Sequence, residues 1–519
     1  MLVRRGAGAV ALALAVTLSV PGTASAVPAP GAPGAGDPYY PFAGNGGYDV
    51  AHYAIDLSYQ PATDELEGRT KISATATQDL SRFNLDFALR VSSVHVNGVP
   101  ATFSKDPTDS SELIVTPAAA LPKQAAFTVL VSYADIPSTV AVDTHKLWNW
   151  RPTRTISTNQ PRSSEWWYPA NDHPSDKATY QVSVAVPNGS SAISNGVLRG
   201  KTADKPGWTR WHWDATAHPM VSYLPFLAMG QFEVEKDTYH GLPSLRAYDL
   251  GLKEKGHLEI AKANLRRSDE ITDFFRTRFG PYPFEATGGV AVSDLNLALE
   301  NQTRSVYGDF AWSETDPSWL IAHEQAHQWF GDSVSLATWQ HMWLNEGFAT
   351  YGEWLWSEQQ GKASADELAE AFYTRYPAED AFWSTIVSDP KRIFSTAVYQ
   401  RGAMALHAVR KAVGDATFFA VLQSFAGKYK NRNATTADFV RHAEWVAQRQ
   451  LDDVFDTWIH TAGKPPTSPN GTAARPVRRA VAQQADALAD LHDHLTTTGH
   501  GHAHGHDDGH DDSTAPSAR

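Results

Sequence analysis

The sequence predicts a multidomain α+β protein in which a β-rich N-terminal domain, residues 45–236, precedes a mostly helical domain, residues 237–465. In the first region apolar side chains alternate with smaller or polar ones, which is the period of a strand with one buried face. The clearest runs are Tyr53, Ile55, Leu57 and Tyr59; Phe83, Leu85, Phe87 and Leu89; and Tyr180, Val182, Val184 and Val186.

Turn signals and a change in residue composition support this division into two domains. Asn97-Gly98, Asn188-Gly189 and Asn195-Gly196 separate the alternating runs, and such pairs predict hairpins because both turn residues need positive φ. From Lys253 to Arg278 the chain becomes charged, with apolar positions at helical spacing. We expect helices from there to about Gly463, interrupted by a short strand at 289–292.

The bulk composition limits the function classes. A chain of 519 residues is long enough for two or three domains, and 42% hydrophobic residues supply a large core. The formal net charge of −13 argues against nucleic-acid binding, which needs a basic surface. The chain has no Cys, so any metal site must use His and carboxylate ligands.

The first 26 residues have the organisation of a signal peptide. Arg4 and Arg5 are followed by a short apolar run from Gly6 to Val20, and Ala24-Ser25-Ala26 is a small-residue cleavage pattern. The run is shorter than the roughly 20 residues that span a bilayer. We therefore expect a secreted protein without a stable membrane anchor.

Two segments outside the domains have biased composition. Residues 27–44 begin Pro/Ala/Gly-rich and are predicted to be a flexible linker. Residues 466–519 lose hydrophobicity and are predicted to be a disordered His/Asp-rich tail. We expect the tail to bind zinc or another divalent ion loosely, the alternative being a solvated terminus without a role. Its histidines are His492, His494, His500, His502, His504, His506 and His510.

The motif with the strongest chemical meaning is His323-Glu324-Gln325-Ala326-His327. Asp316-Pro317 before it is typical of a helix start. On a helix, His323 and His327 project from one face, at the spacing of two Zn²⁺ ligands. Glu324 is placed to take a proton from a water that attacks a carbonyl. The plain alternative is a helix with two surface histidines.

A candidate third ligand argues against a helix with two ordinary surface histidines. The segment from Trp339 to Glu353 is predicted to be a helix, and it carries Glu346, nineteen positions after His327. A Glu on an adjacent antiparallel helix would complete three protein ligands and leave the fourth position open, as in catalytic zinc sites. The sequence thus predicts one catalytic Zn²⁺ bound by His323, His327 and Glu346.

The flanking residues resemble a known family. His323 to Gly331 (HEQAHQWFG) and Trp343 to Ala349 (WLNEGFA) are similar to motifs of the aminopeptidase N family of gluzincin metallopeptidases. The likeness covers roughly residues 45–465 and implies an N-terminal β-saddle domain and a thermolysin-like catalytic domain. Within the family, the chain resembles the short secreted bacterial type, which lacks the large C-terminal helical domain.

The resemblance also implies substrate-facing residues. Tyr399, in Val398 to Ala403, matches the family tyrosine that stabilises the oxyanion. Leu297-Ala298-Leu299-Glu300-Asn301 resembles the Gly-x-Met-Glu-Asn exopeptidase motif, so Ala298, Glu300 and Asn301 are expected to bind substrate. Glu300 would bind the free α-amine. The strand predicted before this motif offers an edge for an extended peptide.

Three positions depart from the family pattern. Leu297 stands in place of Gly and Leu299 in place of Met. By the resemblance, Gln160 occupies the position of a second amine-binding Glu. An amide is a weaker partner for an ammonium than a carboxylate, but it can still donate or accept a hydrogen bond. We therefore predict that Gln160 contacts substrate; the alternative is that it is an ordinary loop residue.

The expected function is a secreted zinc aminopeptidase acting on peptides. Two alternatives stay open: a broader metallopeptidase with endopeptidase activity, and a non-catalytic zinc-binding protein. The sequence determines neither side-chain preference nor oligomeric state.

Overall fold

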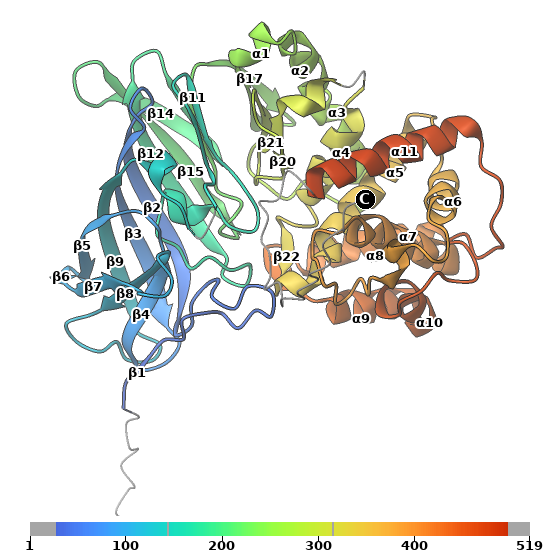
Figure 1. The fold of residues 1–519 in the computed structure, drawn as a ribbon, viewed down its shortest axis with the longest axis horizontal. Helices are drawn as coiled ribbons and strands as arrows, with labels where there is room; N and C mark the ends of the chain where they lie inside the picture. Colours follow the sequence, from blue (N-terminus) through green and yellow to red (C-terminus); the bar gives the residue numbers. More distant parts are fainter. Residues whose placement is uncertain (1–26, 143–144, 314–315, 497–519) are drawn as a thin grey trace, which may run out of the picture.

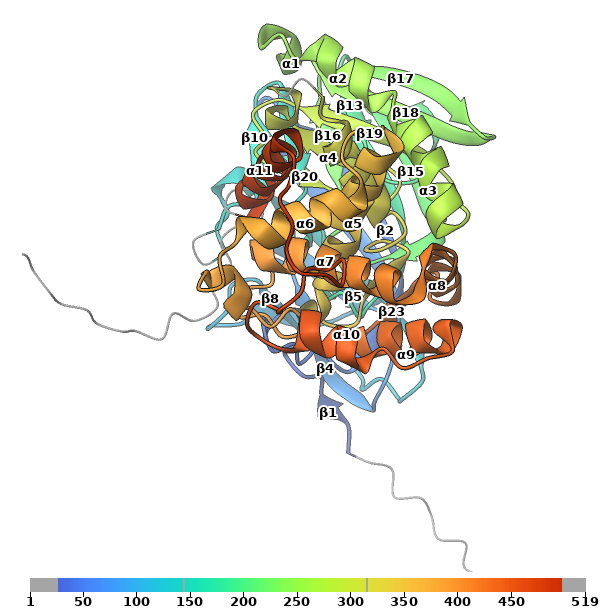
Figure 2. The same cartoon turned by 90° about the vertical axis from the view of Figure 1, so that its right-hand side faces the viewer.

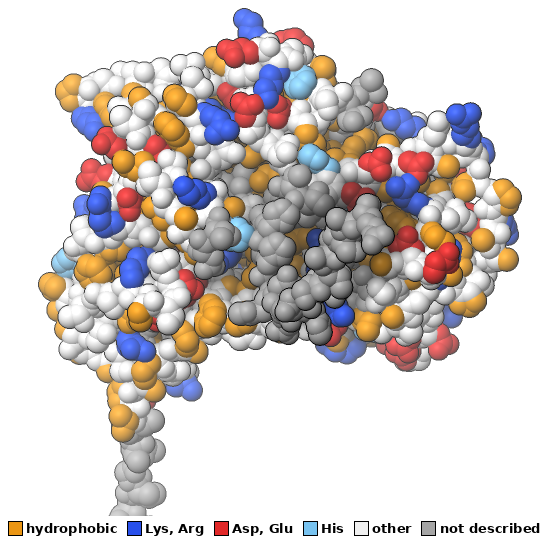
Figure 3. Space-filling view, viewed as in Figure 1, with side chains coloured by type: hydrophobic (Ala, Val, Ile, Leu, Met, Phe, Trp, Pro, Cys, Tyr) orange, Lys and Arg blue, Asp and Glu red, His pale blue; other side chains and the backbone are white. Residues whose placement is uncertain are grey.

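A computed structural model describes residues 27–142, 145–313 and 316–496, which form a β-rich domain beside a largely helical one (Figure 1). The predicted signal peptide, residues 1–26, lies outside the described residues. Within the described ranges, no helix combines the length and apolarity that a membrane span requires. On the face in Figure 3, basic and acidic side chains are mixed over both domains.

The N-terminal domain is built on an eight-stranded sheet in the order β14-β15-β12-β2-β3-β9-β5-β6. Its central strand β2 pairs antiparallel with β3 and parallel with β12, so two of the three predicted alternating runs, on β2 and β12, lie side by side, while the run that begins at Phe83 lies on β4 of another sheet. Tyr53, Ile55 and Leu57 are buried as the period predicts. The strands are β2 Tyr48–Gln60, β3 Glu65–Ala76, β5 Val91–Val96, β6 Val99–Pro100, β9 Ala126–Asp135, β12 Ala178–Pro187, β14 Val197–Ala203 and β15 Trp208–Met220.

Two four-stranded sheets complete this domain, in the orders β1-β4-β8-β7 and β10-β11-β16-β13. Their strands are β1 Ala29–Pro30, β4 Leu80–Asp86, β7 Thr102–Lys105, β8 Glu112–Thr116, β10 Trp148–Arg151, β11 Arg154–Ser157, β13 Ser191–Ile193 and β16 Leu227–Gly230.

One of the three predicted hairpins is present. Asn97 and Gly98 both have positive φ and join β5 to β6, which pair with each other. The prediction is wrong for Asn188-Gly189 and Asn195-Gly196, because they connect β13 to strands of another sheet. An Asn-Gly pair specifies a turn, but tertiary packing decides which strands then pair.

The second domain contains a five-stranded sheet in the order β17-β18-β19-β21-β20, with β18, β19 and β21 parallel. The predicted boundary at residue 236 is wrong, because it falls inside β17, which pairs along its whole length with β18. The strands are β17 Phe232–Tyr239, β18 Leu242–Asp249, β19 Thr287–Val292, β20 Ala298–Leu299 and β21 Ser305–Gly308; β22 Val334–Leu336 and β23 Arg432–Ala434 form a separate pair.

Helices pack against this sheet and against one another (Figures 1 and 2). They are α1 Gly251–Glu254, α2 Leu258–Leu265, α3 Ser268–Phe279, α4 Ser318–His327, α5 Trp343–Gln359, α6 Ala365–Arg375, α7 Thr396–Val413, α8 Asp415–Lys428, α9 Thr436–Ala447, α10 Asp452–Phe455 and α11 Arg479–His494. The 3₁₀ turns are Pro137–Thr139, Ser164–Trp166, Asp309–Ser313, Trp339–His341 and Ala381–Ser384, and Asp456–His460 is a short π-helix.

The segment predicted to be a flexible linker is ordered from residue 27 onward, so that prediction is wrong. Asp37 is 2% exposed. Its Oδ2 accepts from the Trp339 backbone N–H at 2.9 Å and lies 3.2 Å from His173 Nε2. A carboxylate buried between two domains with these partners fixes the segment in place, which a Pro/Ala/Gly-rich composition does not reveal.

The predicted disorder of residues 466–519 is wrong for the part that the structure describes. Residues 479–494 form α11, which packs on α6 and α7 through Val481, Ala485, Leu488 and Ala489. In Figure 1 this helix, in red, runs across the helical domain toward β20. The histidines from His500 onward lie outside the described residues.

Candidate active site

Helix α4 presents both predicted histidine ligands. It begins at Ser318, directly after the Asp316-Pro317 pair, and Asp316 Oδ1 accepts from the Ser318 backbone N–H at 3.1 Å. His323 and His327 are both buried, and one helical turn separates them.

Helix α5 brings Glu346 to the same place. It begins at Trp343 after a 3₁₀ turn, and Glu346 is buried in its first turn. Gly347 lies against Gly402 of α7, where an added Cβ would come within 3.0 Å of the Gly402 backbone. This close approach explains a glycine inside a helix and sets α5 directly against the helix that carries Tyr399.

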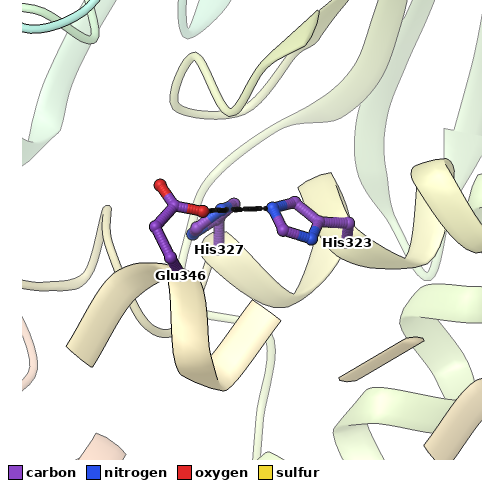
Figure 4. A group of neighbouring side chains, drawn as sticks. All are labelled: His323, His327 and Glu346. Atoms are coloured by element: carbon purple, nitrogen blue, oxygen red, sulfur yellow. Dashed lines mark hydrogen bonds and ion pairs between the residues drawn. The ribbon is translucent and has the colours of Figure 1, made fainter. Parts of the chain in front are cut away.

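The three ligand atoms converge (Figure 4). His323 Nε2 and His327 Nε2 are 3.1 Å apart, and Glu346 Oε2 lies 3.3 Å from the first and 3.5 Å from the second. Ligands bound at 2.0–2.1 Å to a tetrahedral zinc lie about 3.3 Å from one another. The spacing and the His₂Glu donor set therefore fit a zinc ion.

The opposite side of each imidazole is also held. Glu353 Oε1 lies 2.6 Å from His323 Nδ1, and the Phe330 carbonyl oxygen lies 3.0 Å from His327 Nδ1. With acceptors at both Nδ1 atoms, each Nδ1 carries the hydrogen and each Nε2 lone pair faces the ligand cluster. Sequence reasoning missed Glu353, although it follows Glu346 by seven positions and so shares its helix face.

The electrostatics keep the third ligand ionised. Burial alone would raise the pKa of Glu346, but the adjacent His327 and His323 outweigh it and hold that pKa well below the ordinary glutamate value.

Glu324 is buried beside the cluster. Burial raises its pKa to about 8, partly opposed by His323 and His327. Its Oε2 has no hydrogen-bond partner among the described residues. One ligand atom each of Glu324, Glu300 and His327 lie within 4.8 Å of one another. A carboxylate oriented in this way can bind and deprotonate a small molecule such as water.

Tyr399 lies next to the cluster on α7. Its ring stacks on that of His323, with centroids 6.2 Å apart and planes 17° apart. Burial, and then the nearby Glu346, raise the pKa of Tyr399 well above its ordinary value, so the phenol stays protonated and able to donate.

The predicted amine binder Glu300 follows directly on the edge strand β20. It is buried, and Tyr223 from the N-terminal domain donates to its Oε1 at 2.8 Å. Gln328, next to His327, donates to the Glu300 carbonyl oxygen at 3.0 Å, which ties this segment to the zinc-ligand helix. Sequence reasoning missed Tyr223, which no motif or spacing distinguishes.

Ala298 and Asn301 have different environments. Ala298, in β20, pairs with Tyr307 of β21, and the other edge of β20 has no strand among the described residues. The prediction that the strand at 289–292 supplies the edge is wrong, because β19 lies between β18 and β21. Asn301 donates to the Leu224 carbonyl oxygen at 2.9 Å and accepts from Thr158 at 2.8 Å, so its amide joins the two domains.

Gln160 is fully buried two residues after Thr158, and the Thr158–Asn301 hydrogen bond holds its segment against the Glu300 segment. Neither polar atom of its side-chain amide has a hydrogen-bond partner among the described residues. Buried amides are normally satisfied, so this amide keeps unused hydrogen-bonding capacity next to the Glu300 segment.

Comparisons with known proteins agree with this arrangement. The Peptidase M1 N-terminal domain matches residues 50–224, and the Peptidase family M1 domain matches residues 284–458. Human glutamyl aminopeptidase is 27% identical over 342 residues, which are 60% of this chain and 34% of that protein. Dog aminopeptidase N is 26% identical over 57% of this chain and 34% of its own length. The chain thus spans about a third of the length of these curated relatives.

Solved structures match over more of their length. The M1 zinc metallopeptidase from Deinococcus radiodurans is 28% identical, with a TM-score of 0.73, over 86% of this chain and 99% of its own. A two-domain M1 zinc metallopeptidase bound to L-arginine is 27% identical, also with a TM-score of 0.73, over 86% of this chain and all of its own. These matches confirm the predicted order of a β-rich domain and a helical metallopeptidase domain. The chain belongs to the M1 family of zinc metallopeptidases.

Proposed function

We propose that the protein is a zinc aminopeptidase that removes N-terminal residues from peptides. The observation that carries the proposal is a second buried carboxylate, Glu300, placed within 4.8 Å of Glu324 and His327 and at the end of an edge strand. A metallopeptidase that cleaves within chains has no need of this anion, whereas a free α-ammonium in a buried cleft requires one.

Each side chain of the candidate site has its own role in the proposed reaction. His323, His327 and Glu346 would hold the zinc, which acts as a Lewis acid toward the scissile carbonyl. Glu324 accepts a proton from the attacking water and returns it to the leaving amine. Tyr399 donates a hydrogen bond to the oxyanion. The open edge of β20 pairs with the substrate backbone, while Glu300 and Gln160 bind the amine.

The relatives support this assignment of substrate class. M1 zinc metallopeptidase structures have been solved with L-arginine, L-tryptophan and a Tyr-Ser-Ala substrate. The ligand of our protein is proposed to carry the same free amino group.

A substrate panel tests the proposal. Ala-, Leu- and Lys-arylamides, their N-acetylated counterparts and a protein substrate are assayed with and without a chelator. We expect chelator-sensitive cleavage of the free-amine substrates only. Equal cleavage of the blocked peptides would establish the broader peptidase alternative, and a zinc-binding but inert protein would establish the non-catalytic one. Retention of Glu324 speaks against the latter, because zinc storage needs ligands but no base.

Glu300→Gln should lower kcat/KM for Leu-arylamide by about 10- to 100-fold, because a charge-assisted hydrogen bond to the ammonium becomes a neutral one. Steady-state kinetics on the free and N-acetylated substrates measure the change. The matched control is Tyr223→Phe, which removes only the hydroxyl that bonds to Glu300 and should have a smaller effect. An identical loss on both substrates would contradict amine recognition by Glu300.

Tyr399→Phe should lower kcat by about 10²- to 10³-fold, since it removes one donor to the oxyanion, and should leave KM nearly unchanged. The control is Tyr351→Phe, a buried tyrosine on α5 whose hydroxyl lies 3.1 Å from His407 instead. A Tyr399→Phe enzyme with normal kcat would refute the role of this hydroxyl.

Export is proposed from residues 1–26. The basic Arg4-Arg5 pair, the apolar run and the Ala24-Ser25-Ala26 pattern support it. Intact-mass analysis of protein from the culture medium should give a chain beginning at Val27, and an uncleaved chain confined to the cytoplasm would contradict export.

The second metal site predicted for the histidine-rich tail gains no support from the described residues. His492, one of its expected ligands, is fully buried with its Nε2 2.8 Å from Glu353 Oε1, and so does not belong to a solvated tail.

A further inference from the structure

The C-terminal helix α11 reaches the candidate zinc site. Besides its apolar face, polar contacts hold the helix along its length. Asp486 pairs with Arg375 of α6, and Gln484 donates to Ser357 of α5 at 2.8 Å. Asp493 accepts from Thr396 of α7. Near its end, the His494 ring lies 4.8 Å from that of Phe310, which follows β21. The helix therefore bridges from α6 and α7 to the strand side of the domain.

His492 is the residue that α11 directs toward the active site. Its side chain has no solvent exposure. Its Nε2 lies 2.8 Å from Glu353 Oε1, and Gln400 Nε2 donates to its Nδ1. Since Nδ1 accepts, Nε2 carries the hydrogen and donates to the carboxylate.

Glu353 Oε1 is consequently shared by two histidines. It lies 2.6 Å from His323 Nδ1 and 2.8 Å from His492 Nε2. The His492 ring is also 5.7 Å from the His323 ring and 5.3 Å from that of Tyr399. Gln400, its other partner, directly follows Tyr399 in α7. One buried side chain from the end of the described chain thus contacts the carboxylate that bonds to a candidate zinc ligand, and its ring lies next to that of Tyr399.

We propose that His492 is a positioning residue of the active site, fixing Glu353 so that His323 keeps its orientation toward zinc. The inference rests on the proposed role of His323 as a ligand. Partners that orient a metal ligand typically contribute 10- to 100-fold in metal affinity. His492 acts one hydrogen bond further out, on Glu353. The match to the Peptidase family M1 domain ends at residue 458, so α11 lies beyond the region that the family model describes.

Three variants of the full-length protein test the proposal. His492→Leu removes both hydrogen bonds, His492→Gln keeps a donor for Glu353, and His494→Leu makes the same apolar change two positions away on the same helix. For each, the zinc Kd is measured by competition with a chromophoric chelator, the visible spectrum is recorded with Co²⁺ in place of zinc, and kcat, KM and Tm are determined.

We expect His492→Leu to raise the zinc Kd by about 10-fold, to shift the Co²⁺ bands and to lower kcat more than KM. His492→Gln should recover most of the zinc affinity, and His494→Leu should keep the wild-type zinc Kd and Co²⁺ spectrum. A His492→Leu protein with the zinc Kd and Co²⁺ spectrum of the wild type would overturn the proposal. So would three variants that have the same zinc affinity as one another and differ from the wild type only by a lower Tm.

The zinc-ligand variant His327→Ala separates the two claims. If it loses zinc while His492→Leu does not, only the role of His492 is wrong. If His327→Ala binds zinc normally, the proposed metal site is wrong, and with it this inference.

Discussion

Glu324→Gln should reduce kcat/KM by about 10³-fold or more while leaving the zinc content at one ion per chain, since general acid–base catalysis contributes up to about 10⁴-fold. The amide keeps the size of the side chain but cannot accept the proton of the attacking water. Glu324 lies beside the three ligands without belonging to them, so zinc binding should survive the change.

The matched control for this experiment is Glu370→Gln, the same substitution at another buried glutamate, on α6 away from the metal cluster. It should retain the kcat/KM of the wild type. A Glu324→Gln enzyme within 10-fold of wild type would show that another group removes the proton.

His327→Ala should abolish activity at stoichiometric zinc and weaken zinc binding by about 10³-fold or more, because three protein ligands become two. Zinc content after dialysis and activity across a zinc titration are the measurements. His442→Ala, a buried histidine on α9, serves as the control: it should lower Tm but keep one zinc ion per chain. Equal zinc content in His327→Ala and wild type would rule out this ligand set.

The metal triad could be predicted from sequence because its geometry is largely local. His323 and His327 are held one turn apart by a single helix, and α5 is the next α-helix in the chain, after β22 and a 3₁₀ turn. The groups that support the triad could not be predicted in the same way. Tyr223 and His492 come from other parts of the chain, and only tertiary packing brings them to Glu300 and Glu353.

Composition was misleading at both ends of the described chain. Around Asp37 the Pro/Ala/Gly-rich sequence predicts a linker, yet one carboxylate bonded to the Trp339 backbone fixes it. Residues 479–494 were overlooked beside the His/Asp-rich terminus, although Val481, Ala485, Leu488 and His492 recur at helical spacing. That periodicity could have identified α11 and its inward histidine.

We propose that one zinc ion at His323, His327 and Glu346 drives hydrolysis of peptides with a free N-terminal amine. The most direct test titrates zinc into metal-free protein while following Leu-arylamide and N-acetyl-Leu-arylamide in parallel. We expect hydrolysis of the free-amine substrate to rise linearly and to saturate at one zinc per chain, with the acetylated substrate left intact. Full activity without zinc, or equal rates on the two substrates, would contradict it.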